Sequence, residues 1–175
     1  MEIIRLDSSY RGKELVFRYQ TAYYYDICCQ EDTDGFSFTL QRRALPEPVE
    51  KSFTDKLLEP WLEEPRLFAA RMDGKDLGFL ELSHEQWNNR MRVSNIWVAE
   101  GRRRAGVGSA LMERAVEEAR AARARSLVLE TQSCNDPAIR FYRKNGFALI
   151  GFDLTAYSET DVEKQEVRLE FARPV

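Results

Sequence analysis

Apolar and polar residues alternate through the middle of the chain in a pattern that predicts paired strands. RLFAARM and DLGFLELSHE flank the turn DGKD, and MRVSNIWVA follows the polar turn WNN. Period-two alternation bounded by turn residues is typical of hairpins. We therefore expect three consecutive antiparallel strands between residues 66 and 99.

The spacing then becomes helical. Apolar side chains recur every three or four residues at Leu111, Ala115, Ala119 and Ala122. This spacing predicts an amphipathic helix, and the apolar stretch SLVLET predicts a buried strand after it. A strand, a helix and a strand across residues 92–131 predict a parallel pair joined by a right-handed crossover.

A second helix is predicted in NDPAIRFYRKNGF. Asn135 or Asp136 would cap it, Pro137 would occupy its first helical position, and Gly146 would follow its end. The alternating segments FALIGFDLTAY and EVRLEF predict two further strands near the C-terminus.

The N-terminal third is less regular. EIIRL predicts a first strand, residues 10–21 have helical spacing, and residues 22–42 predict a hairpin or two loosely paired strands. Four prolines then divide residues 44–65 into a loop, a short helix beginning near Thr54, and another loop.

Composition limits the possible partners. A length of 175 residues with 43% hydrophobic residues predicts one domain, residues 1–175. A net charge of −3 argues against general attraction to nucleic acid or an anionic membrane surface. Three cysteines without framework spacing, and no signal peptide or membrane-spanning run, favour a cytoplasmic protein. His84 is the sole histidine, so we expect no metal site.

The turn RRRAGVGSAL, between a predicted strand and a predicted helix, is a candidate anion site. Such a turn directs backbone N–H groups and the positive end of a helix dipole toward one point. It lacks the Lys-[Ser/Thr] pair of a Walker A loop, and Leu111 stands where a dinucleotide fingerprint has its third glycine. Taken alone, the turn could equally be a solvated basic loop.

A second feature changes that balance. The spacing Arg103-x-x-Gly106-x-Gly108 after NIWVA, followed by Asn135 and FYRKNGF, resembles the GNAT superfamily of N-acetyltransferases. GFLELSHEQWNNRMRVSNIWVAEG, LETQSCNDPAIRFY and GFDLTAYS are similar to its streptothricin acetyltransferase group. The resemblance implies an α/β (α+β) fold: a mixed, mostly antiparallel sheet of about six to seven strands, with a splayed parallel pair and about four flanking helices.

The resemblance also implies acetyl-CoA as cofactor and assigns residues to it. The turn would wrap the pyrophosphate through Arg103, Arg104, Ala105, Gly106, Val107, Gly108 and Ser109. Ile96, Trp97 and Val98 would bind the pantetheine arm, with an oxyanion donor on the backbone near Val98.

The same resemblance places Asn135 against the cofactor arm and makes Tyr142 the general acid beside the thioester sulfur. Outside this motif, Tyr142 would be read as an aromatic packing on the inner face of a helix. Cys134 is expected to be a small packing residue, because direct transfer needs no acyl-enzyme.

The acceptor site is less defined. Many family members place a carboxylate on the strand matching RVSNIWV, where this chain has Ser94 and Asn95. We therefore assign the base to Glu81, and we expect Glu85 on the same strand face to bind substrate. A solvated strand face is the alternative for at least one of the two.

Charge distribution favours a small cationic amine as acceptor, since residues 47–85 are acidic and residues 102–125 are rich in arginine. Trp61, Trp87 and Tyr157 could line its site, or belong to the core or rim. A protein or peptide N-acetyltransferase and a non-catalytic acyl-CoA-binding domain remain alternatives, and the chain could be a monomer or a homodimer.

Overall fold

The structure, a computed structural model, describes all of residues 1–175. Its residues group into two compact units. The first contains Met1–Phe17, Phe53–Leu129 and Ala172–Val175, and the second contains Arg18–Ser52 and Glu130–Phe171. Each unit therefore combines segments that are far apart in the sequence.

Seven strands form one hydrogen-bonded sheet. They are β1 (Glu2–Leu6), β4 (Arg66–Met72), β5 (Lys75–Glu85), β6 (Arg90–Val98), β7 (Ser126–Gln132), β8 (Ala148–Asp153) and β9 (Arg168–Pro174). Their order in the sheet is β1-β4-β5-β6-β7-β9-β8. The pairs β1–β4, β4–β5 and β5–β6 are antiparallel, whereas β6–β7 is parallel. The expected fold class is confirmed.

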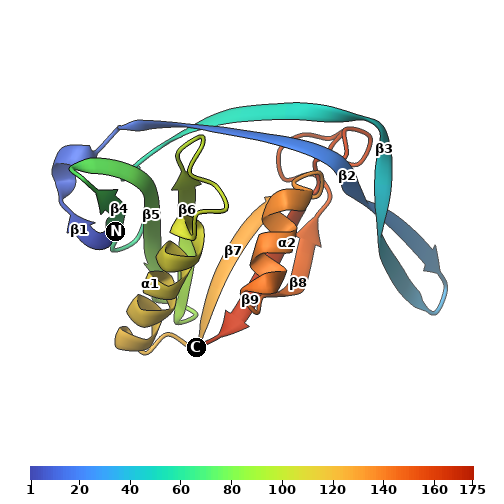
Figure 1. Cartoon of the computed structure of the whole chain (residues 1–175). Coiled ribbons are helices and arrows are strands. Elements are labelled where there is room, and N and C mark those ends of the chain that lie inside the picture. The colour runs from blue at the N-terminus through green and yellow to red at the C-terminus, as the bar shows by residue number, and fades with distance from the viewer. The chain divides into compact units, whose positions relative to one another are not determined.

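Helix α1 (Val107–Ala121) joins the parallel strands, as the predicted crossover requires. The β6–β7 pairing covers three residue pairs, from Arg90–Ser126 to Arg92–Val128. In the first unit α1 lies along β5 and β6 (Figure 1). A Cβ on Gly78 would lie 2.7 Å from the carbonyl oxygen of Trp97 and 3.0 Å from Leu111 Cδ1, so a glycine is needed for this close approach.

The first unit also contains a cluster of buried apolar side chains, some of them from β4 and β5. It contains Leu15, Leu57, Leu58, Leu67, Ala69 and Phe79. Phe79 belongs to the strand face opposite Gly78, because successive side chains of a strand point to opposite faces. The cluster therefore covers the face of β5 that α1 does not.

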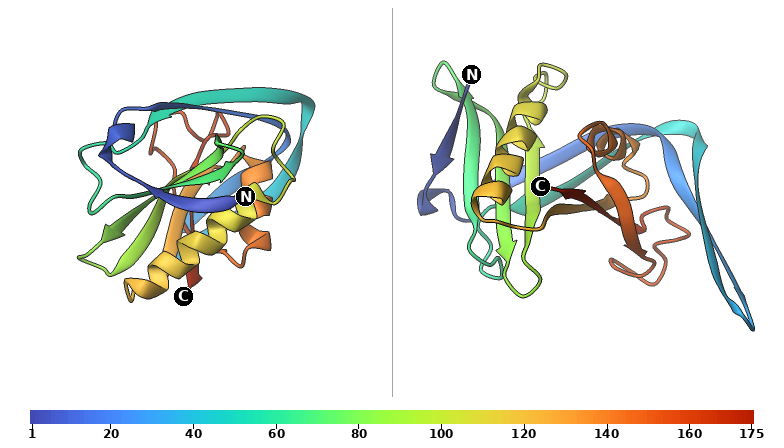
Figure 2. Two further views of the ribbon diagram at one scale, coloured as in Figure 1. Left: turned by 60° about the vertical axis from the view of Figure 1, so that its left-hand side comes forward. Right: turned by 90° about the horizontal axis from the view of Figure 1, so that it is seen from below.

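The second unit contains most of a long two-stranded sheet formed by β2 (Glu14–Asp32) and β3 (Gly35–Lys56). We call its residues 18–52 the ribbon; Figures 1 and 2 show its two strands running side by side to their connecting turn. Within this unit, the ribbon is joined to later residues by the Tyr25 N–H, which donates to the Ser133 carbonyl at 2.9 Å. Lys51 also pairs with Glu166, with 2.6 Å between Nζ and Oε1.

Helix α2 (Asp136–Lys144) also belongs to the second unit. It buries Asp136, Ile139 and Tyr142. The Tyr142 ring lies 6.1 Å from that of Phe147 and 6.3 Å from that of Phe171, centroid to centroid. Asn135, one of the two predicted caps, caps the helix, and Pro137 is its second residue, one position later than predicted.

The expected helix over residues 10–21 is wrong. A single 3-10 turn, η1 (Ser8–Tyr10), precedes β2, and from residue 15 to residue 21 odd-numbered residues are buried or half-buried and even-numbered ones exposed. Leu15 and Tyr19 are four residues apart, an even spacing that fits one face of a strand as well as one face of a helix.

The short helix expected near Thr54 is also absent. β3 continues through Pro46 and Pro48 to Lys56. Each strand of a two-stranded sheet has a free edge, where proline's missing N–H is tolerated. The fold thus has two α-helices and one 3-10 turn in place of about four helices. Neither α-helix has the length and apolarity needed to span a membrane.

Candidate active site

The start of α1 has no side-chain cap. Gly106 occupies the N-cap position with φ of +83°, no side chain caps the helix, and its first turn contains no acidic residue. The first helical hydrogen bond runs from Ala110 N to Gly106 O at 3.0 Å. The N–H groups of Val107, Gly108 and Ser109 therefore have no acceptor within the helix. This arrangement fits phosphate oxygens.

The predicted pantetheine-binding residues lie at the end of β6 that leads into this turn. Ile96, Trp97 and Val98 pair with β5 at Leu80, Phe79 and Gly78. Trp97 Nε1 donates to the Val16 carbonyl at 2.9 Å, and its ring packs 5.7 Å from Phe79. The Trp97 side chain is therefore held by protein groups, which leaves the backbone of residues 96–98 as the part that could meet a cofactor.

A β-bulge lies just before these residues. Glu81 pairs with Asn95 and Leu82 pairs with Val93, so Ser94 is the extra residue of β6. Its Oγ is buried and has no hydrogen-bond partner. A bulge redirects side chains locally and is common beside active sites.

Glu81 is buried, with both carboxylate oxygens occupied. Oε1 accepts a hydrogen bond from the Leu58 N–H at 2.6 Å, and Oε2 accepts one from Asn95 Nδ2 at 2.9 Å. Burial raises the pKa of this carboxyl, and the two hydrogen bonds oppose that rise. Leu58 has φ of +58°, and Arg11 Nη1 donates to its carbonyl at 2.8 Å. Glu81 thus also holds a strained turn in place.

Glu85 and Trp87 lie at the far end of the β5–β6 hairpin from residues 96–98. Glu85 pairs with Arg92 and accepts a hydrogen bond from Asn88 Nδ2 at 3.1 Å. Trp87 is 83% exposed. Four residues along a strand span about 13 Å, so Glu85 shares a face with Glu81 without being close to it. The structure does not bring Glu81 and Glu85 together.

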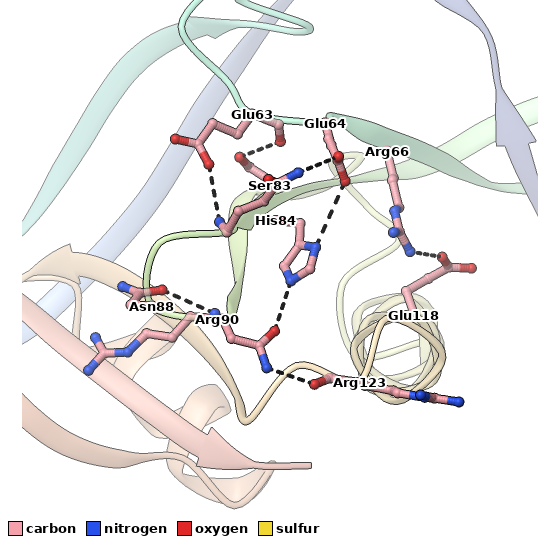
Figure 3. Close-up of polar contacts among 11 residues, drawn as sticks. Glu63, Glu64, Arg66, Ser83, His84, Asn88, Arg90, Glu118 and Arg123 are labelled. Atoms are coloured by element: carbon pink, nitrogen blue, oxygen red, sulfur yellow. Dashed lines mark hydrogen bonds and ion pairs between the residues drawn. The ribbon is translucent and has the colours of Figure 1, made fainter.

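His84 belongs to a polar network away from the α1 start (Figure 3). Its Nε2 lies 3.1 Å from Asn89 Oδ1, and its Nδ1 lies 3.8 Å from Glu64 Oε2. The backbone N–H of His84 and the hydroxyl of Ser83 both donate to the Glu63 carbonyl. These contacts fasten residues 63–64 to β5, which gives the imidazole a structural role. No group of residues in the chain has the composition of a metal site.

In the second unit, Asn135 caps α2 by accepting a hydrogen bond at Oδ1 from the Ala138 N–H at 3.3 Å. Tyr142, two turns further along the helix, is 8% exposed. Burial raises the pKa of its phenol to about 12, so the group remains protonated at neutral pH. Tyr157 is about half exposed, and its backbone N–H donates to Asp161 Oδ2.

Cys134 is buried beside Tyr19, with 3.3 Å between the thiol sulfur and the phenol oxygen. Burial raises the pKa of the thiol, which disfavours a nucleophilic thiolate. This environment supports the expected packing role.

Two contacts of the candidate site were missed by the sequence analysis. One joins Glu81 to Leu58, and the other joins Arg42 of β3 to Asp136 of α2. The partners are 23 and 94 residues apart, so neither pair lies within reach of a local motif. The burial of Glu81 and Asp136 also cannot be predicted from the amino-acid composition.

Comparison with known proteins agrees with this geometry. Residues 35–147 match the acetyltransferase (GNAT) family model. A streptothricin acetyltransferase from Streptomyces lavendulae is 36% identical over 140 residues, covering 75% of this chain and 74% of that protein. The crystal structure of a nourseothricin acetyltransferase is 31% identical with a TM-score of 0.79, covering 99% of this chain and 97% of that one.

A crystal structure from Bacillus anthracis str. Ames, in complex with acetyl coenzyme A, has the same fold. Its TM-score is 0.72 at 21% identity, covering 99% of this chain and 97% of that one. The family model spans more than half of the present chain, including the α1 turn and α2. The chain belongs to the GNAT family of acetyltransferases.

Proposed function

We propose that this enzyme transfers the acetyl group of acetyl-CoA to a primary amine of a small, cationic antibiotic of the streptothricin type. The observation that carries the proposal is the uncapped start of α1, a candidate anion site, in a chain that is 31% identical to a nourseothricin acetyltransferase in an alignment covering 99% of this chain. The 36% identity to a streptothricin acetyltransferase supports the choice of acceptor. Acetylation would remove a positive charge from such an antibiotic.

Acetyl-CoA is the donor in GNAT enzymes, and the first unit has groups suited to it. The N–H groups at the start of α1 would bind its pyrophosphate, with Arg103 and Arg104 adding positive charge. The absence of a Cβ at Gly106 would let the backbone at this residue and at Ala105 approach the oxygens. The backbone of residues 96–98 would bind the pantetheine arm and polarise the thioester carbonyl.

The reaction forms a C–N bond and breaks a C–S bond. The amine nitrogen attacks the thioester carbonyl carbon, and the tetrahedral intermediate expels the thiolate of CoA. Tyr142 would donate a hydrogen bond to the departing sulfur, because its phenol, with a pKa of about 12, remains protonated beside a thiol of reference pKa about 8.5. The proton lost by the amine balances the one gained by CoA.

Glu81 is the proposed acceptor of the amine proton. Burial raises the pKa of its carboxyl, which strengthens its affinity for a proton. Because both oxygens already accept hydrogen bonds, the proton would reach the carboxylate through a water molecule. Asn135 would contact the cofactor arm, and Tyr157 would offer an aromatic face to a cation.

Cellular location and assembly are part of the proposal. All three cysteines are free thiols, which supports a cytoplasmic enzyme. Acetyl-CoA is itself an intracellular cofactor. A monomer and a homodimer fit the proposal equally well, because all of the proposed site residues belong to one chain.

The decisive experiment measures CoA thiol release with acetyl-CoA and three acceptors: a streptothricin, a peptide with a free N-terminus, and lysine. We expect kcat/KM for the streptothricin to exceed that for either other acceptor by at least 100-fold. Preference for the peptide would instead identify a peptide N-acetyltransferase. Acetyl-CoA binding by calorimetry without turnover of any acceptor would identify an acyl-CoA-binding protein.

A further inference from the structure

Arg42 of the ribbon is clamped onto the first turn of α2. Its Nε lies 2.7 Å from Asp136 Oδ1 and its Nη2 lies 2.9 Å from Asp136 Oδ2. The guanidinium carbon lies 3.4 Å from the centroid of the Tyr23 ring. Figure 1 shows the ribbon passing the end of α2 at which this turn lies.

The pair is built for a guanidinium. Two N–H donors of one planar group meet two carboxylate oxygens while the guanidinium lies over an aromatic ring, and lysine has no planar fork with which to form this pair of hydrogen bonds. The side chain of Asp136 is only 7% exposed. Loss of Arg42 would leave this buried carboxylate without its ion-pair partner.

The neighbouring arginine of the same strand has a more exposed carboxylate partner and donates only one hydrogen bond to it. Arg43 pairs with Asp26 at 3.0 Å, with side chains 54% and 42% exposed. Asp26 belongs to β2, so this pair lies within the ribbon and does not reach α2. Arg43 is therefore a matched control for Arg42.

The location of the pair gives it a functional consequence. Asp136 directly follows Asn135, the cap of α2, and the same nine-residue helix carries Tyr142. A short helix moves as a rigid body, so a displacement of its first turn is transmitted to Tyr142. We propose that Arg42 is a positioning residue of the transferase, fixing through Asp136 the placement of Asn135 and Tyr142.

This inference rests on the roles proposed above for Asn135 and Tyr142. It assigns a task to the ribbon: the ribbon sets the position of the helix that bears the acid. Arg42 acts through Asp136 and is not itself expected to touch the thioester.

The test compares Arg42→Ala, Arg42→Lys and Arg43→Ala at 25 °C, after thermal melts confirm that each is folded there. We expect Arg42→Ala to lower kcat about 10- to 100-fold, since displacement of a reacting group by about 1 Å costs up to about 100-fold. Arg42→Lys keeps the charge but loses the fork, so its kcat should fall between those of Arg42→Ala and the wild type. Arg43→Ala should stay within twofold of the wild type.

Amide hydrogen exchange provides a readout that needs no acceptor. Exchange at residues 135–142 should accelerate in Arg42→Ala and not in Arg43→Ala. If the wild type turned over no amine, the proposed function would fail while this exchange difference could still be measured.

If Arg42→Ala does not fold, Asp136→Asn carries the test. It should lower kcat similarly, and adding Arg42→Lys should cause little further loss, because the two residues act as one unit. Equal kcat and equal exchange for the Arg42 and Arg43 variants would overturn the proposal, as would a purely thermal effect with unchanged kcat.

Discussion

The two helices of this enzyme begin in opposite ways. α2 starts with an asparagine whose side chain caps it, an acid in its first turn, a proline, and an arginine paired with that acid. α1 starts with a glycine in the left-handed region, no capping side chain and no acid. One start is closed by the protein's own groups, and the other leaves its donors available.

The difference separates stability from binding. A cap satisfies the orphan N–H groups of a helix and typically stabilises the protein by about 1 kcal/mol. α1 forgoes this gain, and its unpaired donors fit the proposed role of binding an external anion. The uncapped helix, α1, is thus the one expected to bind the cofactor. The capped helix, α2, is the one expected to hold the Tyr142 side chain in position.

The variant with the largest expected effect tests the proposed role of Tyr142 in the capped helix α2. Tyr142→Phe should lower kcat about 10²- to 10⁴-fold, because the departing sulfur loses its hydrogen-bond donor. Binding of acetyl-CoA, measured by calorimetry, should change little. With a phenol pKa of about 12, wild-type kcat should also show no alkaline decline from this group below about pH 11.

Tyr24→Phe, at a half-buried tyrosine of the ribbon, is the control and should retain wild-type kcat. A Tyr142→Phe enzyme with kcat within threefold of the wild type would show that the phenol only packs.

The second variant adds a carboxylate to the uncapped start of α1. Ser109→Asp places a carboxylate in the first turn of α1, where it interacts favourably with the helix dipole and repels phosphate. The free energy of unfolding should stay level or rise by about 0.5 kcal/mol. KM for acetyl-CoA should rise about 100-fold, because like charges brought together cost several kcal/mol.

Ser109→Asn, which is neutral and similar in size to aspartate, should keep KM near the wild-type value. Equal KM values for the two variants would contradict a pyrophosphate site at this helix start.

A third prediction concerns the buried acid of the unit that carries the open start. The pKa of Glu81 is raised in the folded protein, so the folded state holds this proton more tightly than the unfolded chain. Its contribution to stability is complete below pH about 4.5 and is lost as pH rises through the folded-state pKa, with a slope of at most about 1.4 kcal/mol per pH unit.

Glu81→Gln should remove that slope, as measured by urea unfolding between pH 4 and pH 8. If Glu81 is the base, the acidic limb of the kcat/KM profile should also disappear in this variant. Parallel stability curves for wild type and Glu81→Gln would mean that Glu81 does not titrate in this range.

The variant with the smallest expected effect removes the side-chain cap of α2. Asn135→Ala removes the cap of α2 and should lower the free energy of unfolding by about 1 kcal/mol, or Tm by about 2–4 °C. Asn135→Asp retains a capping oxygen and should keep the wild-type Tm. If Asn135→Ala had no effect on Tm, the contrast between the two helix starts would lose its energetic basis.

Local features of the site were predictable, and distant ones were not. The α1 turn, the β5–β6 hairpin and the capped α2 each follow from residues a few positions apart. Period-two alternation placed Glu81 and Glu85 on one face, but face alone does not give distance from residues 96–98. The ties of Glu81 to Leu58 and of Arg42 to Asp136 depend on chain folding over 23 and 94 residues.

The ribbon was predicted only in part, for a related reason. Residues 22–42 showed strand character, whereas Leu15 and Tyr19 fitted both periods and the prolines suggested a break. The true length of β2 and β3 depends on each strand having the other as partner. A strand whose pattern is ambiguous alone becomes regular once its neighbour is present.

The second unit is made of two segments that are far apart in the sequence, so the ribosome completes them at different times. Residues 53–129, which are 77 residues, separate the ribbon from the segment that completes its unit. At about 5–20 residues per second, a ribosome needs roughly 4 to 15 s to add them. During that interval the ribbon, with its exposed Phe36 and Phe38, waits outside the exit tunnel without Asp136 or Glu166. The ion pairs of Arg42 and Lys51 can therefore form only after this delay.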